Sequence, residues 1–163
     1  MKLETGSGAR MGSHTPLGTL EGHIAPAEGA HERIRTLIAD DSAVCRQVAV
    51  LLLARLPQVE MVGAAEDGVD ALALVASTRP DLVLMDLQMP RLDGLQATRK
   101  IRAEFPGVRV IMTSFNDSEE WKAASVASGA DRFIRKECLR DELPGAVAQL
   151  FSGRASGAEG VRP

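Results

Sequence analysis

The sequence predicts an α/β fold, because short apolar runs rich in β-branched residues alternate with helical patterns along most of the chain. Five runs are candidate strands, and they cover residues 35–39, 60–65, 81–86, 109–113 and 132–135. Their continuous apolar character is typical of strands buried on both faces. A repeated strand-then-helix order implies right-handed crossovers, so we expect one parallel sheet with helices on both faces.

The candidate helices carry apolar stripes and ordinary boundary signals. In the first helix the residues on one face are Val44, Val48, Leu51 and Leu52, and in the last they are Leu139, Leu143, Ala146, Val147 and Leu150. We expect both faces to pack against the sheet. Helix N-caps are expected at Asp67, Asp93 and Ser118, and the returns to the next strand are marked by Pro57, Pro80 and Pro106.

Length and composition favour one domain that does not bind nucleic acid. With 163 residues, the chain is long enough for one compact domain with tails and short for two. Only 3% of the residues are aromatic, so the core must be built mainly from Leu, Val, Ile and Ala. A formal net charge of -3 argues against a protein that neutralises phosphate backbones, and direct binding to DNA is not expected.

The sequence carries no sign of export or membrane insertion. It has no run of about 18 apolar residues and no basic start followed by an apolar stretch, so we expect a soluble, cytoplasmic protein without a membrane partner. Cys45 and Cys138 form neither a CxxC pair nor a disulfide framework, which fits a reducing compartment. Both cysteines are predicted to be small buried hydrophobic residues.

The two ends of the chain differ in character from its middle. Residues 1–33 are rich in Gly with scattered Ser, Thr and Pro and have no apolar period, which predicts a disordered leader. This leader is natural sequence, the product of a start assigned upstream of Met11, or vector-derived sequence, and the residues leave all three origins open. Residues 152–163 are predicted to form a flexible tail, so the folded domain should span residues 34–151.

Polar side chains gather where four of the five candidate strands end. In chain order they are Asp40 and Asp41, Asp86, Thr113 and Ser114, and Lys136. Parallel strands end at the same edge of a sheet, where doubly wound folds bind their ligands. Each residue alone also has an ordinary explanation, since Asp often caps a helix, Thr is common in strands and a surface Lys is solvated.

Three carboxylates at one edge of a sheet require a cation. At an effective dielectric constant near 20, each close pair of carboxylates repels by about 4 kcal/mol. Mg²⁺ prefers hard oxygen ligands, takes one or two carboxylates and leaves positions for water and a phosphate oxygen. The sequence therefore predicts a Mg²⁺ site at this edge, with Lys136 supplying the remaining positive charge.

Several stretches together resemble the receiver domain of bacterial response regulators, which is the phosphoacceptor module of two-component signalling and phosphorelays. The stretches are LIADDS (37–42), AEDGVDAL (65–72), DLVLMDLQMPRLDG (81–94), VIMTS (110–114) and GADRFIRK (129–136). The resemblance covers residues 34–151, in the order and at the spacing of the family. It implies a single doubly wound (βα)5 domain with a five-stranded parallel sheet of order 2-1-3-4-5.

The resemblance also implies a phosphoacceptor and a set of metal ligands. Asp86 would attack a phosphohistidine and become an aspartyl phosphate. Mg²⁺ would be the cofactor, bound by Asp86 and Asp41 directly, by Asp40 through water, and by the backbone carbonyl of Gln88. Little further chemistry is required, because phosphoryl transfer depends mainly on positioning and on neutralising charge.

A switch is implied as well. Lys136 would pair with one phosphoryl oxygen and Thr113 would donate a hydrogen bond to another, with Ser114 beside it in the same phosphoryl-binding and switch region. Phe133 would turn inward as Thr113 moves. A near-complete change of state requires about 5.5 kcal/mol of differential stabilisation, which the new dianion would supply in part. The resemblance assigns the switched face to the fourth helix, fifth strand and fifth helix.

The partners implied are proteins. The phosphoryl donor would be a sensor histidine kinase or a histidine phosphotransfer protein, because all the histidines (His14, His23 and His31) lie in the predicted leader. A downstream protein target would bind the switched face, and the chain would be a monomer or a phosphorylation-dependent dimer. Phe115 and Trp121 lie near this face; Phe115 is predicted to be a core residue, and Trp121 is either core or a partner contact.

Two features of the carboxyl-terminal part leave questions open. Glu137 follows Lys136 where many relatives have Pro, and a cis bond at a residue other than Pro costs about 3–4 kcal/mol, so the geometry of this bond is open. The segment KECLRDEL is similar to receivers that precede helix-turn-helix domains. We prefer a single-domain regulator, and the alternative is a receiver fragment of a longer regulator with a DNA-binding output domain.

Other classes fit the residues less well. Phosphohydrolases of the haloacid dehalogenase type also use an Asp nucleophile and Mg²⁺, but they place a second Asp two residues further on, where this chain has Gln88. A degenerate receiver would lack one of the acids or the Lys. No nucleotide-binding GxGxxG or GxxxxGK[ST] motif occurs. We therefore expect a signalling receiver and not a turnover enzyme.

Overall fold

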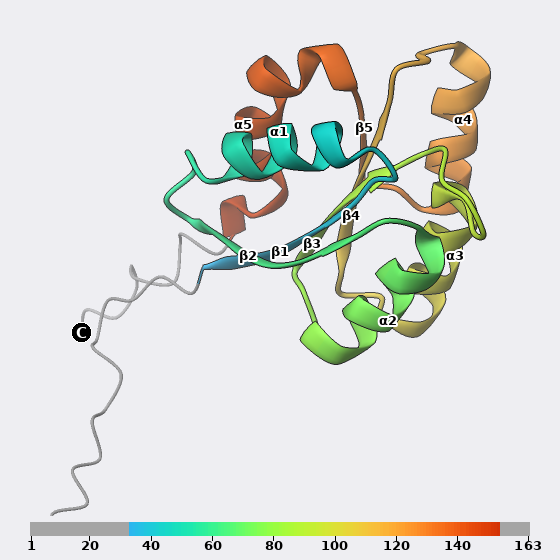
Figure 1. The fold of residues 1–163 in the computed structure, drawn as a ribbon. Coiled ribbons are helices and arrows are strands. Elements are labelled where there is room, and N and C mark those ends of the chain that lie inside the picture. Colours follow the sequence, from blue (N-terminus) through green and yellow to red (C-terminus); the bar gives the residue numbers. More distant parts are fainter. Residues whose placement is uncertain (1–32, 154–163) are drawn as a thin grey trace, which may run out of the picture. The chain divides into compact units, whose positions relative to one another are not determined.

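The computed structural model describes residues 33–153, in which five strands alternate with five α-helices (Figure 1). The strands are β1 (Ile34–Ala39), β2 (Val59–Ala65), β3 (Leu82–Asp86), β4 (Arg109–Ser114) and β5 (Arg132–Arg135). The helices are α1 (Ala43–Leu53), α2 (Gly68–Thr78), α3 (Gly94–Glu104), α4 (Glu119–Ser128) and α5 (Leu139–Leu150), with a 3₁₀ turn at Lys136–Cys138. The predicted leader up to residue 32, its three histidines and the tail beyond residue 153 lie outside the described residues.

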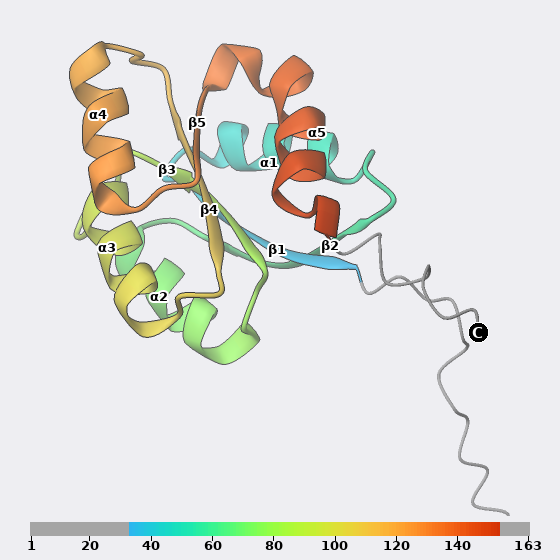
Figure 2. The ribbon, with the colours of Figure 1, turned by 180° about the vertical axis from the view of Figure 1, so that it is seen from behind.

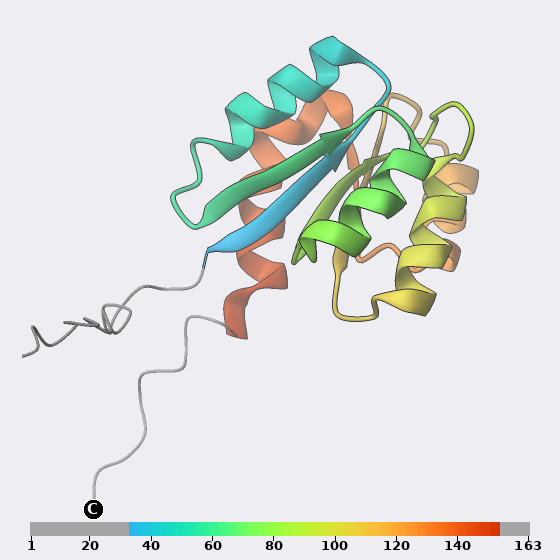
Figure 3. The same ribbon diagram turned by 60° about the horizontal axis from the view of Figure 1, so that its bottom comes forward.

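The sheet is parallel throughout, and its order is β2-β1-β3-β4-β5, as the resemblance implied. Helices α1 and α5 lie together on one face, and α2, α3 and α4 cover the other (Figures 1 and 2). Figure 3 shows β2 at the margin of the sheet beside β1. The chain moves outward from β1 to β2 and then returns to β3, so the strand order reverses between β1 and β3. That reversal is where a doubly wound fold opens a binding crevice.

Residues of the central strands pack alternately on the two faces of the sheet. Val83 and Met85 of β3 belong to the hydrophobic cluster under α2 and α3, whereas Leu84 belongs to the cluster under α1 and α5. Val110 and Ile111 of β4 divide in the same way. Fully burying one aliphatic side chain stabilises the fold by about 1.5–3 kcal/mol. Burial on both faces therefore fixes the position of each central strand in the sheet, and with it the residues that lie at the carboxyl edge.

The apolar face predicted for the first helix is wrong. Ala49 and Leu53 are the residues of α1 buried against the sheet, whereas Val44, Val48 and Leu51 are 71%, 47% and 63% exposed. Since α1 is apolar on almost every side, its spacing of large residues does not single out the buried face. The prediction for the last helix is confirmed: its buried residues are Leu139, Leu143, Ala146 and Val147.

The predicted N-caps are found at the expected positions, with one difference in detail. Asp67 and Asp93 accept hydrogen bonds from backbone N–H groups in the first turns of α2 and α3. Ser118 precedes α4 without a capping side-chain bond. Cys45 and Cys138 are half-buried free thiols, not the fully buried residues predicted.

The peptide bond between Lys136 and Glu137, whose geometry the sequence left open, is trans. No peptide bond among residues 33–153 is cis, so Glu137 follows Lys136 through a trans bond. Within the same residues, no helix is both long enough and apolar enough to cross a membrane.

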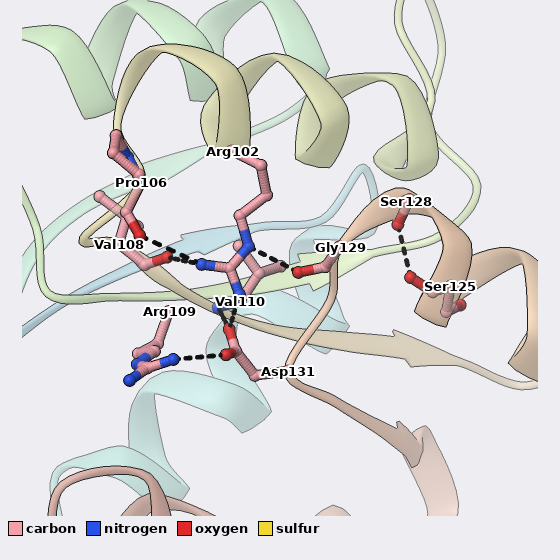
Figure 4. Close-up of polar contacts among 9 residues, drawn as sticks. All are labelled: Arg102, Pro106, Val108, Arg109, Val110, Ser125, Ser128, Gly129 and Asp131. Atoms are coloured by element: carbon pink, nitrogen blue, oxygen red, sulfur yellow. Dashed lines mark hydrogen bonds and ion pairs between the residues drawn. The ribbon is translucent and has the colours of Figure 1, made fainter.

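A paired charge network lies at the amino edge of the sheet, where β4 and β5 begin (Figure 4). Arg102 of α3 donates to the carbonyl of Gly129 at 2.6 Å and to a carboxylate oxygen of Asp131 at 2.5 Å. Asp131 also accepts from Arg109 at 2.9 Å and from the backbone N–H of Val110 at 2.8 Å. These contacts join the end of α3 to the turn between α4 and β5.

Candidate functional site

The first two acids of the site follow β1 directly. Asp40 is buried, and its carboxylate accepts a hydrogen bond from the N–H of Ser42 at 2.9 Å, in the turn that leads into α1. Arg46 in α1 donates to the carbonyl of Asp40 at 2.7 Å and so fixes the backbone of this turn. Asp41, the next residue, is exposed. The turn therefore presents one buried and one open carboxylate at the carboxyl edge of the sheet.

The third acid, Asp86, is the last residue of β3. Its parallel partner across the ladder is Thr113 of β4, and the N–H of Leu87 donates to the Thr113 carbonyl at 2.9 Å. Asp86 is 5% exposed. One carboxylate oxygen from each of Asp40, Asp41 and Asp86 lies within 4.8 Å of the others. The three acids predicted from the strand ends are thus brought together.

Lys136 supplies the cationic group at this edge. Its Nζ lies 2.7 Å from a carboxylate oxygen of Asp40 and 3.0 Å from one of Asp86, and its side chain is 7% exposed. The ring of Phe115 covers the ammonium, with its centroid 5.1 Å from Nζ. Phe115 itself is 61% exposed, so its prediction as a core residue is wrong. It covers the lysine from the solvent side.

Charge compensation at the site is incomplete. Burial raises the pKa of Asp86 to about 6, and the charges of Asp40 and Asp41 act in the same direction, although Lys136 opposes them. Burial lowers the pKa of Lys136, but its contacts with Asp40 and Asp86 outweigh this and leave the pKa above its ordinary value. Three acids facing one ammonium therefore keep an excess of negative charge in a partly buried place.

The donor set fits a hard divalent cation. Carboxylate oxygens that lie within 4.8 Å of one another offer the hard ligands that Mg²⁺ takes from a protein, with water completing its octahedron. Gln88, whose carbonyl was predicted as a further ligand, is exposed and lines a cavity of 470 Å³ together with Asp41. The residues present can therefore hold such an ion.

The predicted switch residues Thr113 and Ser114 end β4, the strand beside Asp86, and Phe133 lies on β5, the strand beyond it. The hydroxyl of Thr113 donates to the carbonyl of Met85 at 3.3 Å, and the hydroxyl of Ser114 accepts from the N–H of Asn116 at 3.0 Å. Both side chains are buried. Phe133 and Trp121 are partly buried and pack against the cluster under α2 and α3. Trp121 therefore combines a core contact with an open side.

Two contacts of the site were not predicted from the sequence. Arg46 holds the turn after β1, and it also pairs with Glu66 after β2 at 2.6 Å. Phe115 covers Lys136 from the loop after β4. A basic residue at the fourth position of the helix that follows an acidic pair is a signal for the first contact. No spacing in the sequence signals the second, because Phe115 follows β4 and Lys136 begins the 3₁₀ turn after β5, far apart along the chain.

The fold and the acidic edge define a doubly wound α/β domain with three clustered aspartates and one paired lysine. The family model of the response regulator receiver domain matches residues 36–148, and the chain belongs to this family.

Three relatives illustrate the match. The transcriptional regulatory protein DegU of Brevibacillus brevis is 35% identical over 123 residues, which are 76% of this chain and 52% of that protein. A protein-glutamate methylesterase/protein-glutamine glutaminase of Myxococcus xanthus is 37% identical over 107 residues, 65% of this chain and 30% of that protein. The signal receiver domain of the putative response regulator NarL from Mycobacterium tuberculosis superposes with a TM-score of 0.71 at 32% identity, covering 75% of this chain and 98% of that one.

These matches cover only part of each curated relative. The chain spans about half the length of the first curated relatives that it matches, with values of 52%, 57% and 56%. Some of the relatives are regulators of transcription, and others are enzymes that carry a receiver. The shared part is the receiver domain of two-component signalling.

Proposed function

We propose that this chain accepts a phosphoryl group on Asp86 from a phosphohistidine of a partner protein. The observation that carries the proposal is the contact set of Asp86, which is buried among two further acids and lies 3.0 Å from the ammonium of Lys136. Asp86 therefore contacts one cation directly and lies beside two further carboxylates that can bind a second cation. This arrangement suits a nucleophile whose product carries more negative charge than the reactant.

The transfer is an in-line displacement at phosphorus. An oxygen of Asp86 forms the new O–P bond as the P–N bond of the phosphohistidine breaks, and the electron pair of that bond goes to the leaving imidazole nitrogen. Lys136 stays within reach of the phosphoryl oxygens, because it already contacts Asp86. Mg²⁺ held by Asp41, Asp86 and the Gln88 carbonyl, with Asp40 through water, would neutralise charge on the other oxygens.

The change of state starts at Thr113. Its hydroxyl now donates to the Met85 carbonyl at a long 3.3 Å, a weak bond that is readily exchanged for one to a phosphoryl oxygen. When Thr113 turns toward the phosphoryl group, Phe133 fills the space behind it. Ser114 lies in the same segment and moves with Thr113. The altered surface is α4, β5 and α5, where a downstream protein target binds.

The phosphoryl donor docks on the exposed face of α1. Val44, Val48 and Leu51 point to solvent, and Val44 and Val48 line an apolar cavity of 240 Å³ next to Lys136 and Phe115. Apolar side chains gathered in the open are typical of a protein contact. A sensor histidine kinase or histidine phosphotransfer protein seated here has its phosphohistidine beside Asp86.

The wider assignment follows from the same function. The chain is a signalling receiver that assists its own phosphorylation and dephosphorylation without being a turnover enzyme, and it works in the cytoplasm as a monomer or a phosphorylation-dependent dimer. Its receiver domain comprises residues 34–151, between a leader (1–33) and a tail (152–163). Residue 88 is Gln, so the second acid of a dehalogenase-type hydrolase is missing.

The proposal is tested by incubating the full chain with a small acyl phosphate and Mg²⁺ and measuring intact mass. The wild type should gain one phosphoryl group, which decays slowly, and Asp86→Asn should gain none. Equal labelling of both proteins would overturn the assignment of Asp86. Continuous turnover of an added phosphomonoester would instead identify a hydrolase.

A further inference from the structure

The loop between β3 and α3, residues 87–93, is anchored tightly at both ends. The N–H of Gly94 donates to the carbonyl of Leu87 at 2.9 Å, so the loop closes on the residue after the phosphoacceptor. A Cβ at Gly94 would lie 2.0 Å from the carbonyl oxygen of Asp86, which only glycine avoids. The position of Gln88 therefore depends on how the middle of this loop is held.

The middle of the loop is a strained three-residue turn. Arg91 has a φ of 61°, in the left-handed region that favours glycine. The N–H of Leu92 donates to the carbonyl of Pro90 at 2.7 Å, which makes Arg91 the central residue of a γ-turn. A γ-turn with positive φ at its centre is rare and strained. Such a conformation persists at a non-glycine residue only when its surroundings hold it.

Two acids at the start of α2 hold the turn. Nε of Arg91 lies 2.6 Å from an oxygen of Asp67, and a second guanidinium nitrogen contacts Asp67 and lies 2.9 Å from Asp70. Asp67 is buried, and its other oxygen caps α2. The N–H of Gly68 also donates to the carbonyl of Leu92 at 3.1 Å. The turn is thus clamped to the end of a core helix by a guanidinium and a backbone hydrogen bond.

We propose that Arg91 is a positioning residue for the Mg²⁺ site, acting through the carbonyl of Gln88. This inference rests on the proposed function, which takes that carbonyl as a ligand. Gln88 lies three residues before Arg91, and both Gln88 and Pro90 line the cavity that Asp41 also lines. The clamp on Asp67 and Asp70 fixes the loop from the side of α2, and the closure on Leu87 fixes it from the side of β3. Gln88 lies between these two fixed points.

The sign of the effect separates positioning from simple electrostatics. Arg91 is a cation in the loop that carries Gln88, so removing it should leave Mg²⁺ binding unchanged or tighten it if only charge matters. If Arg91 positions the Gln88 carbonyl, removing it should weaken Mg²⁺ binding. Partners that orient metal ligands are typically worth 10–100-fold in affinity.

The test is calorimetric titration of MgCl₂ into the full-length chain. Arg91→Ala should raise the Kd for Mg²⁺ about 10-fold. Arg99→Ala, which removes the same charge from the exposed side of α3, should leave the Kd unchanged. An equal or lower Kd in Arg91→Ala than in the wild type would overturn the inference.

Two more variants distinguish the loss of the contacts between Arg91 and the two acids from the relief of the strained φ angle and from unfolding of the protein. Arg91→Gly adopts a positive φ without strain but lacks the clamp, so it should bind Mg²⁺ as weakly as Arg91→Ala; wild-type affinity in this variant would overturn the role of the clamp. Arg91→Lys should recover part of the affinity through Asp67 and Asp70. Melting temperatures measured alongside ensure that affinities are compared between folded proteins.

The two proposals fail in different ways. If the wild type is not labelled on Asp86, the proposed function fails, whatever Arg91 does. If the wild type is labelled and binds Mg²⁺, but Arg91→Ala binds it equally well, only the positioning role of Arg91 fails.

Discussion

Asp131 and Asp86 lie at opposite edges of the same sheet, and the protein compensates the charge of Asp131 fully but that of Asp86 only in part. Burial raises the pKa of Asp131, but the Val110 N–H together with Arg102 and Arg109 outweighs it and leaves the pKa below its ordinary value. Burial raises the pKa of Asp86 to about 6, and a single lysine does not offset it. The first carboxylate has all its partners within the protein. The second keeps a raised pKa although it contacts Lys136, and a carboxylate so perturbed at the carboxyl edge of a sheet is a candidate for a binding site rather than a structural pair.

The largest effect is expected where the ammonium that contacts both Asp40 and Asp86 is removed. Lys136→Met leaves Asp40 and Asp86 buried without their ammonium partner, and breaking a buried pair costs about 3–5 kcal/mol. The free energy of unfolding in metal-free buffer should fall by about 3 kcal/mol, measured by urea titration. Lys100→Met on the exposed side of α3 should change it by less than about 0.5 kcal/mol. A similarly small loss in Lys136→Met would show that the acids need no partner.

At the opposite edge, neutralising the paired acid should also destabilise the protein. Asp131→Asn keeps the shape of the side chain but weakens its bonds to Arg102, Arg109 and the Val110 N–H. Hydrogen bonds to charged groups are worth about 1.5–3 kcal/mol, so a loss of about 2 kcal/mol is expected near neutral pH. The folded-state pKa of Asp131 is lowered, so its contribution is present above the unfolded value of 3.8 and is lost as the pH falls through the lower folded value. The variant should therefore lose less stability than the wild type on acidification.

The same change from Asp to Asn at the acidic edge, at Asp86, should raise the stability of the protein instead of lowering it. The pKa of Asp86 rises from 3.8 to about 6 on folding, so its contribution is full below the unfolded value and is lost as the pH rises through about 6. In metal-free buffer at about pH 7, Asp86→Asn should therefore be more stable than the wild type by about 1 kcal/mol. The gain should vanish on acidification to about pH 4. A destabilised Asp86→Asn would mean that the lysine fully compensates this acid.

The smallest effect is expected for the aromatic cover of Lys136. Phe115 is mostly exposed, and an exposed cation–π contact is worth about 0.5–1 kcal/mol. Phe115→Ala should lower the free energy of unfolding by no more than that, measured by the same urea titration. A loss above about 2 kcal/mol would restore the sequence-based expectation that Phe115 is a core residue.

The sequence predicted the sheet and its acidic edge well, because both rest on short-range patterns. Alternating apolar runs mark strands covered on two sides, and the residues after them must meet at one edge. The burial of α1 was not predictable in the same way. Its large residues Val44, Val48 and Leu51 repeat at helical spacing, but Ala49 and Leu53 pack on the sheet, and spacing alone cannot separate a core stripe from an exposed one.

The contacts made by the loops could not be predicted from the sequence either. Phe115 over Lys136 and Arg91 on Asp67 join residues that are far apart along the chain, and they depend on loop paths that no period encodes. The positive φ of Arg91 was hidden for the same reason, since arginine gives no hint of a left-handed turn as glycine would.

The most direct test of the contrast between the two edges is calorimetric titration of MgCl₂ into the wild type, Asp86→Asn and Asp131→Asn. The same change of residue is made at each edge, so only the surroundings differ. The wild type and Asp131→Asn should bind one Mg²⁺ with the same Kd, and Asp86→Asn should bind it at least about 10-fold more weakly. Equal Mg²⁺ binding by all three proteins would contradict the claim that the acidic edge is completed by a cation.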